Sequence, residues 1–349
     1  MSCDIIIPAW NQLEYTKNCL ESIFKNTHYP YRLVIIDNAS EQPTRNYLQK
    51  LSEQKKIFLL CNEQNLGWIK AINQGIKISS APYICLMNND TLTTDGWLTE
   101  MVFVAENNPQ VGIVNPSSNN FGQKPEGLTI DDYALTLKRY HGQWQELSAT
   151  GFCMLIKREV IDKVGFFDER YNLGYFEETD FYLRAIKKGF LAARAKAAYV
   201  YHYEKVSFRK FDIEKLKETN RNLFYSRWER PTRIAWFISK NSSFSLEEHS
   251  KMLLNLARRG HLIYVFLTKG ELSVNEHPHI RIFKQPVLFS ILKILRRKRR
   301  KRFDNIFSDD LRIADLLERL KSIHQAKVFR DFSKYREKLW RPGCNFQPL

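Results

Sequence analysis

The chain has 349 residues, of which 44% are hydrophobic and 26% are charged, a composition typical of a folded protein with one or two domains rather than a disordered chain. No run of 18 apolar residues occurs, so no membrane-spanning helix is expected. The first residues, MSCDIIIPAWNQ, contain Asp4 and no basic segment, so we expect no signal peptide and a cytoplasmic protein. The six cysteines lack CxxC spacing, and we expect them to be reduced and structural.

The net charge of +16 is concentrated in the last third of the chain. Residues 1–229 carry 28 Lys and Arg against 27 Asp and Glu, whereas residues 230–349 carry 26 against 11. The densest basic run, RRKRRKR at 296–302, directly follows the apolar segment PVLFSILKIL. This composition is typical of a segment that binds an anionic surface, so we expect residues 230–349 to form a basic accessory region.

The first 90 residues alternate between strand-like and helix-like segments. Apolar, strand-like runs cover residues 3–10, 31–40, 56–62 and 81–90, and segments with helical spacing cover residues 12–25, 43–54 and 67–79. This alternation predicts a mostly parallel α/β sheet flanked by helices. Three of the strands end in polar residues, at Asp37 and Asn38, at Asn62, and at 88–90. Because ligands bind outside the carboxyl ends of strands in such sheets, we expect a binding site there.

The middle of the chain is less regular. Residues 115–147 are rich in turn-forming residues, which predicts a long loop with RYHGQW as a lid. Regular secondary structure is expected to resume near Thr150. A helix that begins in YFEETD and ends at Gly189 is expected to follow. A strand over AAYVYHY follows.

Four groups of residues are candidates for chemistry: Asp37, NEQNLGWIKAINQG, NND at 88–90, and YFEETD at 175–180. Each has an ordinary structural alternative. Paired acids such as Glu177 and Glu178 stabilise the first turn of a helix. Asp180 can pair with Arg184 one turn later, and His202 can be a packed core histidine.

The order of these groups resembles that of the inverting family-2 glycosyltransferases, which have the GT-A fold. The matching segments are DIIIPAWNQLEYTKNCLESI, VIIDNAS, NLGWIKAINQGI, YICLMNNDT, GFCMLIKREVIDKVGFFDERY, FEETDFYLRAIKKG and YHYEKVS. They cover about residues 2–210, which is a far more specific signal than any single motif. The resemblance implies a GT-A catalytic domain in residues 1–229, with a Rossmann-like sheet flanked by helices.

The resemblance also implies how a nucleotide-sugar donor is bound. The implied donor-binding residues are Pro8, Ala9 and Asn11 beside the base, Asp37 at the base or ribose, Asn65, Gly67 and Lys70 in the nucleotide pocket, and Asn88 and Asn89. Gly67 allows close approach of the backbone. The form NND is similar to that of enzymes that use dTDP-rhamnose, which favours this donor over a UDP-sugar.

Breaking the bond between sugar and diphosphate builds negative charge, which a divalent cation stabilises. The resemblance implies Asp90 as a metal ligand, although the family motif is Asp-x-Asp and this chain has Asn88 in the first position. It also matches His202 to a histidine that approaches the same metal, with core packing as the equal alternative. Mn²⁺ or Mg²⁺ suits such ligands.

Transfer further requires a base that removes the proton from the acceptor hydroxyl. The family motif is Glu-Asp with the second residue as base, which maps to Glu178, where this chain has Glu in place of Asp. Asp180 is the second candidate.

The last third contains SFSLEEHSKMLLNLARRGHLIYVFLTKG, which resembles the opening of the N-terminal domain of a GT-B glycosyltransferase. Because residues 230–349 are too few for both domains of that fold, we expect either an incomplete GT-B-like domain or a helical segment that docks to a membrane. The apolar residues beside the basic run favour an anionic membrane as partner of residues 287–302 over nucleic acid. A solvated charge run is the remaining alternative.

Together these features predict a metal-dependent inverting glycosyltransferase that is cytoplasmic and peripheral on the inner face of the membrane. It would transfer a sugar from a nucleotide-diphosphate sugar to a growing surface polysaccharide or lipid-linked glycan. The alternatives are a nucleotide-sugar-binding or nucleotidyl-transferring α/β protein, and a basic scaffold that binds membrane or nucleic acid.

Overall fold

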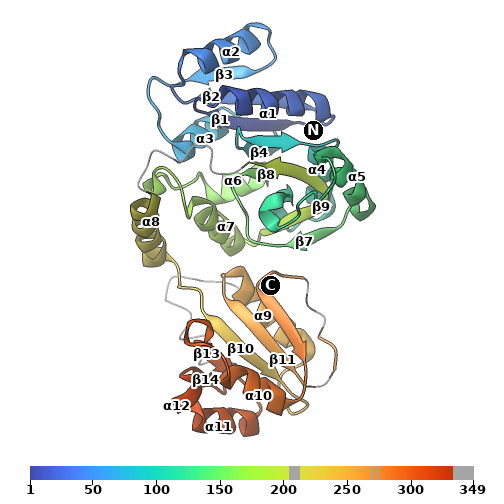
Figure 1. Cartoon of the computed structure of the whole chain (residues 1–349), viewed down its shortest axis with the longest axis vertical. Coiled ribbons are helices and arrows are strands. Elements are labelled where there is room, and N and C mark those ends of the chain that lie inside the picture. The colour runs from blue at the N-terminus through green and yellow to red at the C-terminus, as the bar shows by residue number, and fades with distance from the viewer. Residues whose placement is uncertain (204–212, 269, 273, 275, 333–349) are drawn as a thin grey trace. The chain divides into compact units, whose positions relative to one another are not determined.

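A computed structural model describes residues 1–203, 213–268, 270–272, 274 and 276–332. Residues 204–207, which end the matching segment YHYEKVS, lie outside these ranges. The chain divides into two compact units, Met1–Ser226 and Arg227–Leu349, and each unit has its own β-sheet (Figure 1).

The first unit is a mixed α/β structure. Its strands are β1 (Cys3–Ala9), β2 (Tyr31–Asp37), β3 (Phe58–Cys61), β4 (Tyr83–Met87), β5 (Thr91–Thr93), β6 (Val111–Ser117), β7 (Trp144–Glu146), β8 (Cys153–Lys157) and β9 (Leu191–His202). Its helices are α1 (Leu13–Asn26), α2 (Gln42–Glu53), α3 (Trp68–Lys77), α4 (Trp97–Asn107), α5 (Ile130–Leu137), α6 (Arg158–Val164), α7 (Glu177–Lys187) and α8 (Ile213–Arg227). Three 3-10 turns complete it: η1 (Asn119–Phe121), η2 (Lys138–Tyr140) and η3 (Glu169–Tyr171).

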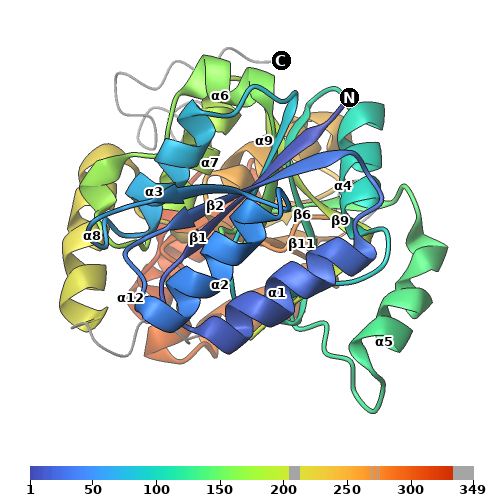
Figure 2. The same ribbon diagram turned by 90° about the horizontal axis from the view of Figure 1, so that it is seen from above.

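The sheet of the first unit has the order β3-β2-β1-β4-β8-β6-β9-β5, and β7 pairs with β9. Strands β3, β2, β1 and β4 are parallel, which confirms the predicted α/β sheet. The chain moves outward from β1 to β3 and then returns to place β4 on the other side of β1. Helices α1 and α2 accordingly lie on one side of β1 and β2, and α3 lies on the other (Figure 2). A crevice is expected outside the carboxyl ends of β1 and β4, where the strand order reverses.

Strands β1 and β4 are buried along their whole length, as expected of parallel strands covered on both faces. Helix α3 packs very closely on β1, because a Cβ added at Gly75 would lie 2.4 Å from Cγ2 of Ile6. Only a glycine allows the helix backbone to come this near. This contact sets the position of α3 on the sheet. It thereby also sets the position of the residues at the amino end of α3 relative to the strand ends.

The prediction of a long loop over residues 115–147 is wrong. Helix α5 forms within it, capped by the side chain of Thr129, and β7 pairs with β9. In the segment RYHGQW, Glu100 accepts a hydrogen bond from the backbone of Gly142 and its other carboxylate oxygen lies 2.5 Å from Nδ1 of His141; that this segment forms a lid stays a prediction. These elements have only eight and three residues, too short for a periodic signal.

The second unit is a separate α/β sheet. Its strands are β10 (Arg233–Ile238), β11 (Leu262–Leu267), β12 (Ile280–Lys284), β13 (Asn305–Phe307) and β14 (Lys327–Phe329). Its helices are α9 (Leu246–Arg258), α10 (Val287–Leu295), α11 (Leu311–Arg319) and α12 (Lys321–His324), with a 3-10 turn η4 (Arg299–Lys301). All strand pairs are parallel in the order β12-β11-β10-β13-β14, so the alternative of a purely helical segment is wrong.

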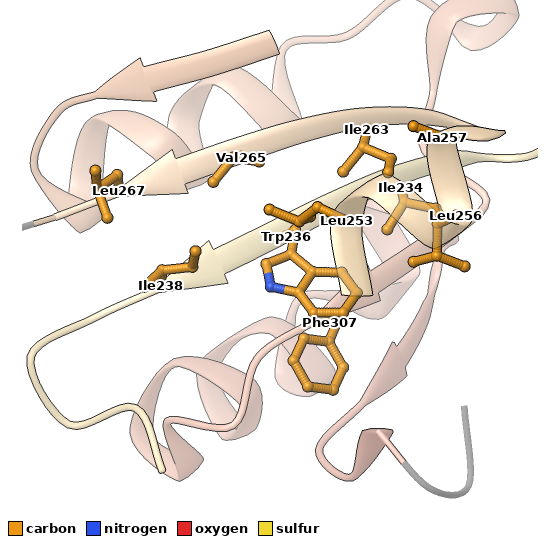
Figure 3. Packing of buried hydrophobic residues seen from close by; sticks show 10 residues of the cluster. All are labelled: Ile234, Trp236, Ile238, Leu253, Leu256, Ala257, Ile263, Val265, Leu267 and Phe307. Atoms are coloured by element: carbon orange, nitrogen blue, oxygen red, sulfur yellow. The ribbon is translucent and has the colours of Figure 1, made fainter. Parts of the chain in front are cut away.

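The core of the second unit covers both faces of this sheet. On one face Trp236 is fully buried, its ring lies 4.1 Å from that of Phe307, and its indole N–H donates to Nδ1 of His249 (Figure 3). On the other face Ile291 and Ile294 of α10 pack against the sheet. Within the described part of the chain, no helix is long and apolar enough to cross a membrane.

Candidate active site

A cleft of about 410 Å³ opens in the first unit beside the carboxyl ends of β1 and β4. Nine residues predicted from the sequence line it: Pro8, Ala9, Asn65, Gly67, Asn88, Asn89, Asp90, Glu178 and His202. The other lining residues are Trp10, Asn38, Trp68, Asn120, Thr150, Gly151, Phe152, Leu173, Gly174, Tyr175 and Glu177. The switch point of the sheet therefore coincides with the cleft.

Asp90 and His202 meet at one corner of the cleft. Strands β5 and β9 are antiparallel, and their register places Thr91 opposite His202. The backbone carbonyl of Asp90 accepts a hydrogen bond from the backbone of Tyr203, which fixes the corner. Nε2 of His202 lies 3.1 Å from Oδ1 of Asp90.

The ring of His202 is held on two sides. It stacks on Phe152 with a centroid separation of 5.3 Å and an interplanar angle of 16°. Nδ1 of the ring lies 2.9 Å from the amide nitrogen of Asn120, and Oδ1 of Asn119 accepts from the backbone N–H of His202. His202 is thus packed and also directed at the cleft, so the two interpretations of this residue are compatible.

The spacing of Asp90 and His202 fits a divalent ion. Adjacent ligands of an octahedral ion bound at about 2.1 Å lie about 3 Å apart, close to the observed separation of their Oδ1 and Nε2 atoms. In the described ranges, no group of three His, Cys, Asp or Glu residues is arranged to hold a metal. An ion at this corner would therefore complete its shell with water or with oxygens of a bound phosphate, as Mg²⁺ commonly does.

The two asparagines before Asp90 have different surroundings. Oδ1 of Asn88 accepts a hydrogen bond from the indole N–H of Trp68, and its Nδ2 lies 3.4 Å from Nε2 of His202. Asn89 is buried, and its amide donates to the hydroxyl of Thr16 on α1. Asn88 can therefore act in the cleft, whereas the side chain of Asn89 ties the strand end to α1.

An amide network fixes the loop that precedes α3. Asn38, at the end of β2, donates to Oδ1 of Asn65 at 2.8 Å and accepts from the backbone of Leu66. Oδ1 of Asn65 also accepts from the backbone of Gly67. Gly67 has φ 82° and ψ 167°, a conformation open almost only to glycine, and a Cβ there would lie 3.1 Å from Cδ2 of Leu173.

Three residues predicted to bind the donor do not line the cleft. Asn11 joins two loops, since its backbone donates to Ser40 and its side chain accepts from the backbone of Glu41. Asp37 is fully buried and accepts from the backbone of Ser40. Lys70 is exposed on α3. Asn11 and Asp37 support the loops behind the cleft.

The first turn of α7 brings two carboxyl groups to the cleft. Oε2 of Glu177 and Oε2 of Glu178 are both buried with no hydrogen-bond partner among the described residues. Burial raises the pKa of both, and the neighbouring charge of Glu178 raises the pKa of Glu177 further. Both carboxyl groups therefore take up a proton at a pH above the usual range of a glutamate.

Asp180, the second candidate base, lies outside the lining of the cleft. It is fully buried and forms an ion pair with Arg184, whose Nε lies 2.8 Å from Oδ2. Arg184 also donates to the backbone carbonyls of Val164 and Phe166. These contacts fasten α7 to the segment after α6.

A family model and several known proteins are similar to this chain. The family model for glycosyl transferase family 2 matches residues 4–165. An uncharacterized glycosyltransferase of Haemophilus influenzae is 27% identical over 130 residues, covering 37% of this chain and 40% of that protein. The O-antigen biosynthesis protein RfbC of Myxococcus xanthus is 23% identical over 230 residues, covering 59% of this chain and 17% of that protein. The solved structure of GalNAc-T7 with UDP, GalNAc and Mn²⁺ aligns with a TM-score of 0.51 at 14% identity, covering 65% of this chain and 48% of that chain.

The first unit has the GT-A fold, and residues 4–165 within it are similar to glycosyltransferase family 2. The predicted resemblance is thereby confirmed for this part of the chain. The alignments span less than half the length of either curated relative. The resemblance of the last third to a GT-B domain stays a prediction.

Several residues of the cleft carry no signal in the sequence. Phe152 lies in an ordinary apolar segment, and Asn120 lies in a stretch predicted as loop. They reach the cleft because η1 and the residue just before β8 converge on His202. Only Trp68, next to Gly67 in the matching segment NLGWIKAINQGI, could have been proposed from its position.

Replacement of Gly67 by Ala should destabilise the first unit for two separable reasons. Gly165 has almost the same backbone conformation, with φ 83° and ψ −164°, but open space where its Cβ would be. Gly165→Ala should therefore cost only the backbone strain, about 1–3 kcal/mol. Gly67→Ala should cost about 1 kcal/mol more in urea unfolding, because Leu173 must move. Equal losses in the two variants would show that the Leu173 contact carries no strain.

Proposed function

We propose that this protein transfers a sugar from a nucleotide-diphosphate sugar to a glycan hydroxyl, with inversion at the anomeric carbon and Glu178 as the base. One observation carries the proposal. A single cleft is lined both by the Asp90 and His202 pair and by the carboxyl groups of Glu177 and Glu178. A donor diphosphate beside Asp90 and His202 and an acceptor hydroxyl beside Glu177 and Glu178 would place the anomeric carbon between the two pairs.

The donor would bind along the strand ends. Pro8 and Ala9 would contact the nucleotide, Gly67 would allow its close approach to the loop before α3, and the amide of Asn88 would donate toward ribose or phosphate. Trp68 donates to Oδ1 of Asn88, while Nδ2 of Asn88 lies 3.4 Å from Nε2 of His202, beside the proposed metal position. The motif NND favours dTDP-rhamnose, with a UDP-sugar as the alternative donor.

In the transfer step the acceptor hydroxyl gives its proton to Glu178 as its oxygen attacks the anomeric carbon. A new carbon–oxygen bond forms while the bond between sugar and diphosphate breaks, and the electron pair leaves with the nucleoside diphosphate. Mn²⁺ or Mg²⁺, held by Asp90 and His202, would stabilise the charge that builds on the leaving group. Burial raises the pKa of both carboxyl groups, which favours uptake of the acceptor's proton by Glu178.

The acceptor we propose is a surface polysaccharide or lipid-linked glycan. The relative RfbC is named for O-antigen biosynthesis, which supports a surface glycan as the product.

Five described cysteines are free, including the exposed Cys61, which is compatible with a reducing cytoplasmic location.

The second unit offers a surface for an anionic membrane. Helix α10 exposes 65% of Leu288 and 61% of Phe289. Directly after it, the side chains of Arg296, Lys298, Arg299, Arg300 and Lys301 are exposed. Arg297 is not available to contact lipid in the same way, because its guanidinium lies 4.2 Å from the ring centroids of Tyr264 and Phe303. Apolar side chains beside free cations are typical of segments that lie on anionic lipid.

The metal assignment predicts that Asp90→Asn and His202→Ala bind Mn²⁺ at least about tenfold more weakly than the unaltered protein, measured by calorimetry with nucleoside diphosphate present. Asp162→Asn is the matched control, because Asp162 is exposed on α6. EDTA should abolish transfer by the unaltered protein. Undiminished Mn²⁺ binding in both site variants would contradict the assignment.

The base assignment predicts that Glu178→Gln binds donor normally but transfers sugar about two to four orders of magnitude more slowly. Asp180→Asn should act mainly on stability, because its partner is Arg184. Since burial raises the pKa of Glu178, kcat should already fall at a pH above the usual range of a glutamate. A folded but inactive Asp180→Asn beside an active Glu178→Gln would move the base to Asp180.

The membrane proposal predicts weaker binding to phosphatidylserine vesicles when Arg296, Arg299, Arg300 and Lys301 are replaced by Gln, at about 1 kcal/mol for each charge. The control replaces four exposed cations elsewhere in the unit: Arg312, Arg319, Lys321 and Lys327. Transfer to a soluble acceptor should stay unchanged in both. Equal loss in the control, or preference of the protein for RNA over vesicles, would refute the docking surface.

A further inference from the structure

The loop that leads into α7 has an unusual backbone. Asn172, Tyr175 and Phe176 have φ values of 54°, 70° and 75°, a left-handed conformation that non-glycine residues rarely adopt. Gly174, between them, has φ 132°. Each such non-glycine residue costs about 1–3 kcal/mol and persists only where the surroundings enforce it. The loop ends directly at Glu177 and lines the cleft with Leu173, Gly174 and Tyr175.

Helix α8 supplies the contacts that enforce this conformation. Asn220 is 2% exposed, and its Nδ2 donates to the carbonyls of Tyr171 at 2.7 Å and Gly174 at 2.5 Å, with a longer contact of 3.4 Å to Tyr175. Two N–H groups thus serve three carbonyls of one loop. One turn later, the buried ring of Phe224 packs on Phe176 at 5.1 Å.

We infer that Asn220 is a positioning residue for the transfer reaction, one that keeps the loop in the shape that presents Glu178 to the cleft. The inference rests on the proposed function, and it adds a residue on an element that does not line the site. Without the amide of Asn220, the carbonyls of Tyr171 and Gly174 each lose a buried hydrogen bond, and the loop can relax toward ordinary backbone angles. The first turn of α7 then moves with it.

The expected consequence is a defect in chemistry rather than in donor binding. Donor contacts lie on the strand ends and on the loop before α3, which Asn220 does not touch. A displacement of about 1 Å at a reacting group can lower the rate about 100-fold. Relaxation of the loop would also admit water to Glu178, and its pKa, raised by burial, would fall toward the usual range.

The test compares Asn220→Ala with two controls at a temperature where all variants are folded. Asn222→Ala removes an exposed asparagine from the same helix. Asn26→Ala removes a buried amide that donates to the carbonyl of Thr93, away from the cleft lining. Calorimetry gives donor affinity, initial rates give kcat between pH 4 and 9, and hydrogen exchange reports on the backbone of residues 172–176.

Asn220→Ala should lower kcat about 10- to 100-fold, leave donor affinity within about twofold, and move the acid limb of the kcat profile to lower pH. Exchange at residues 172–176 should rise in this variant only. If Asn220→Ala does not fold, Asn220→Gln takes its place. This variant keeps the amide but displaces it, so the same changes should appear with smaller magnitude.

A kcat and pH profile for Asn220→Ala equal to those of Asn26→Ala would overturn the inference and reduce Asn220 to a stabilising residue. Faster loop exchange with unchanged kcat would overturn it too. Failure of the proposed function is a different result, because the unaltered protein would then release no sugar from any nucleotide donor.

Discussion

The pairing of β5 with β9 is the constraint on which the site depends. Its antiparallel register sets Thr91 opposite His202, and this brings together two side chains, those of Asp90 and His202, that are 112 positions apart in the chain. A slip of one residue in this pairing would turn His202 to the opposite face of the sheet. Two further segments hold His202 in place. Phe152, just before β8, stacks on its ring, and Asn119 and Asn120 of η1 contact its backbone and its ring.

In the same cleft, the carboxyl groups of Glu177 and Glu178 are perturbed by burial rather than by pairing with a cation. Glu177 and Glu178 begin α7, where the helix dipole favours negative charge, yet burial raises the pKa of both. The nearby acid Asp180 is neutralised by Arg184 and serves to anchor the helix. Glu178 thus lines the cleft while Asp180, on the same helix, is paired with Arg184 outside the cleft lining.

The parallel sheet and the place of the cleft follow from the sequence because parallel strands bring their carboxyl ends to one edge, so the polar residues after β2 and β4 gather there, whereas Asn62 after β3 does not line the cleft. Side-chain direction does not follow in this way. Asn11 and Asp37 come from the expected loops but turn behind the cleft, and Asn38, next to Asp37, lines it instead. Asn220, Phe152 and Asn120 act through tertiary contacts that no local pattern encodes. In the second unit, β13 and β14 have only three residues each, too few for a periodic signal.

The central claim is that one cleft aligns a donor and an acceptor for a single displacement at the anomeric carbon. The most direct measurement is proton NMR of the first sugar released when the protein, with Mn²⁺, turns over a nucleotide sugar slowly with water as the acceptor. Direct attack from the face opposite the diphosphate predicts that this sugar first appears with the anomeric configuration opposite to that of the donor. Initial release with the configuration of the donor would contradict the account, because retention requires a covalent intermediate or a different geometry of attack.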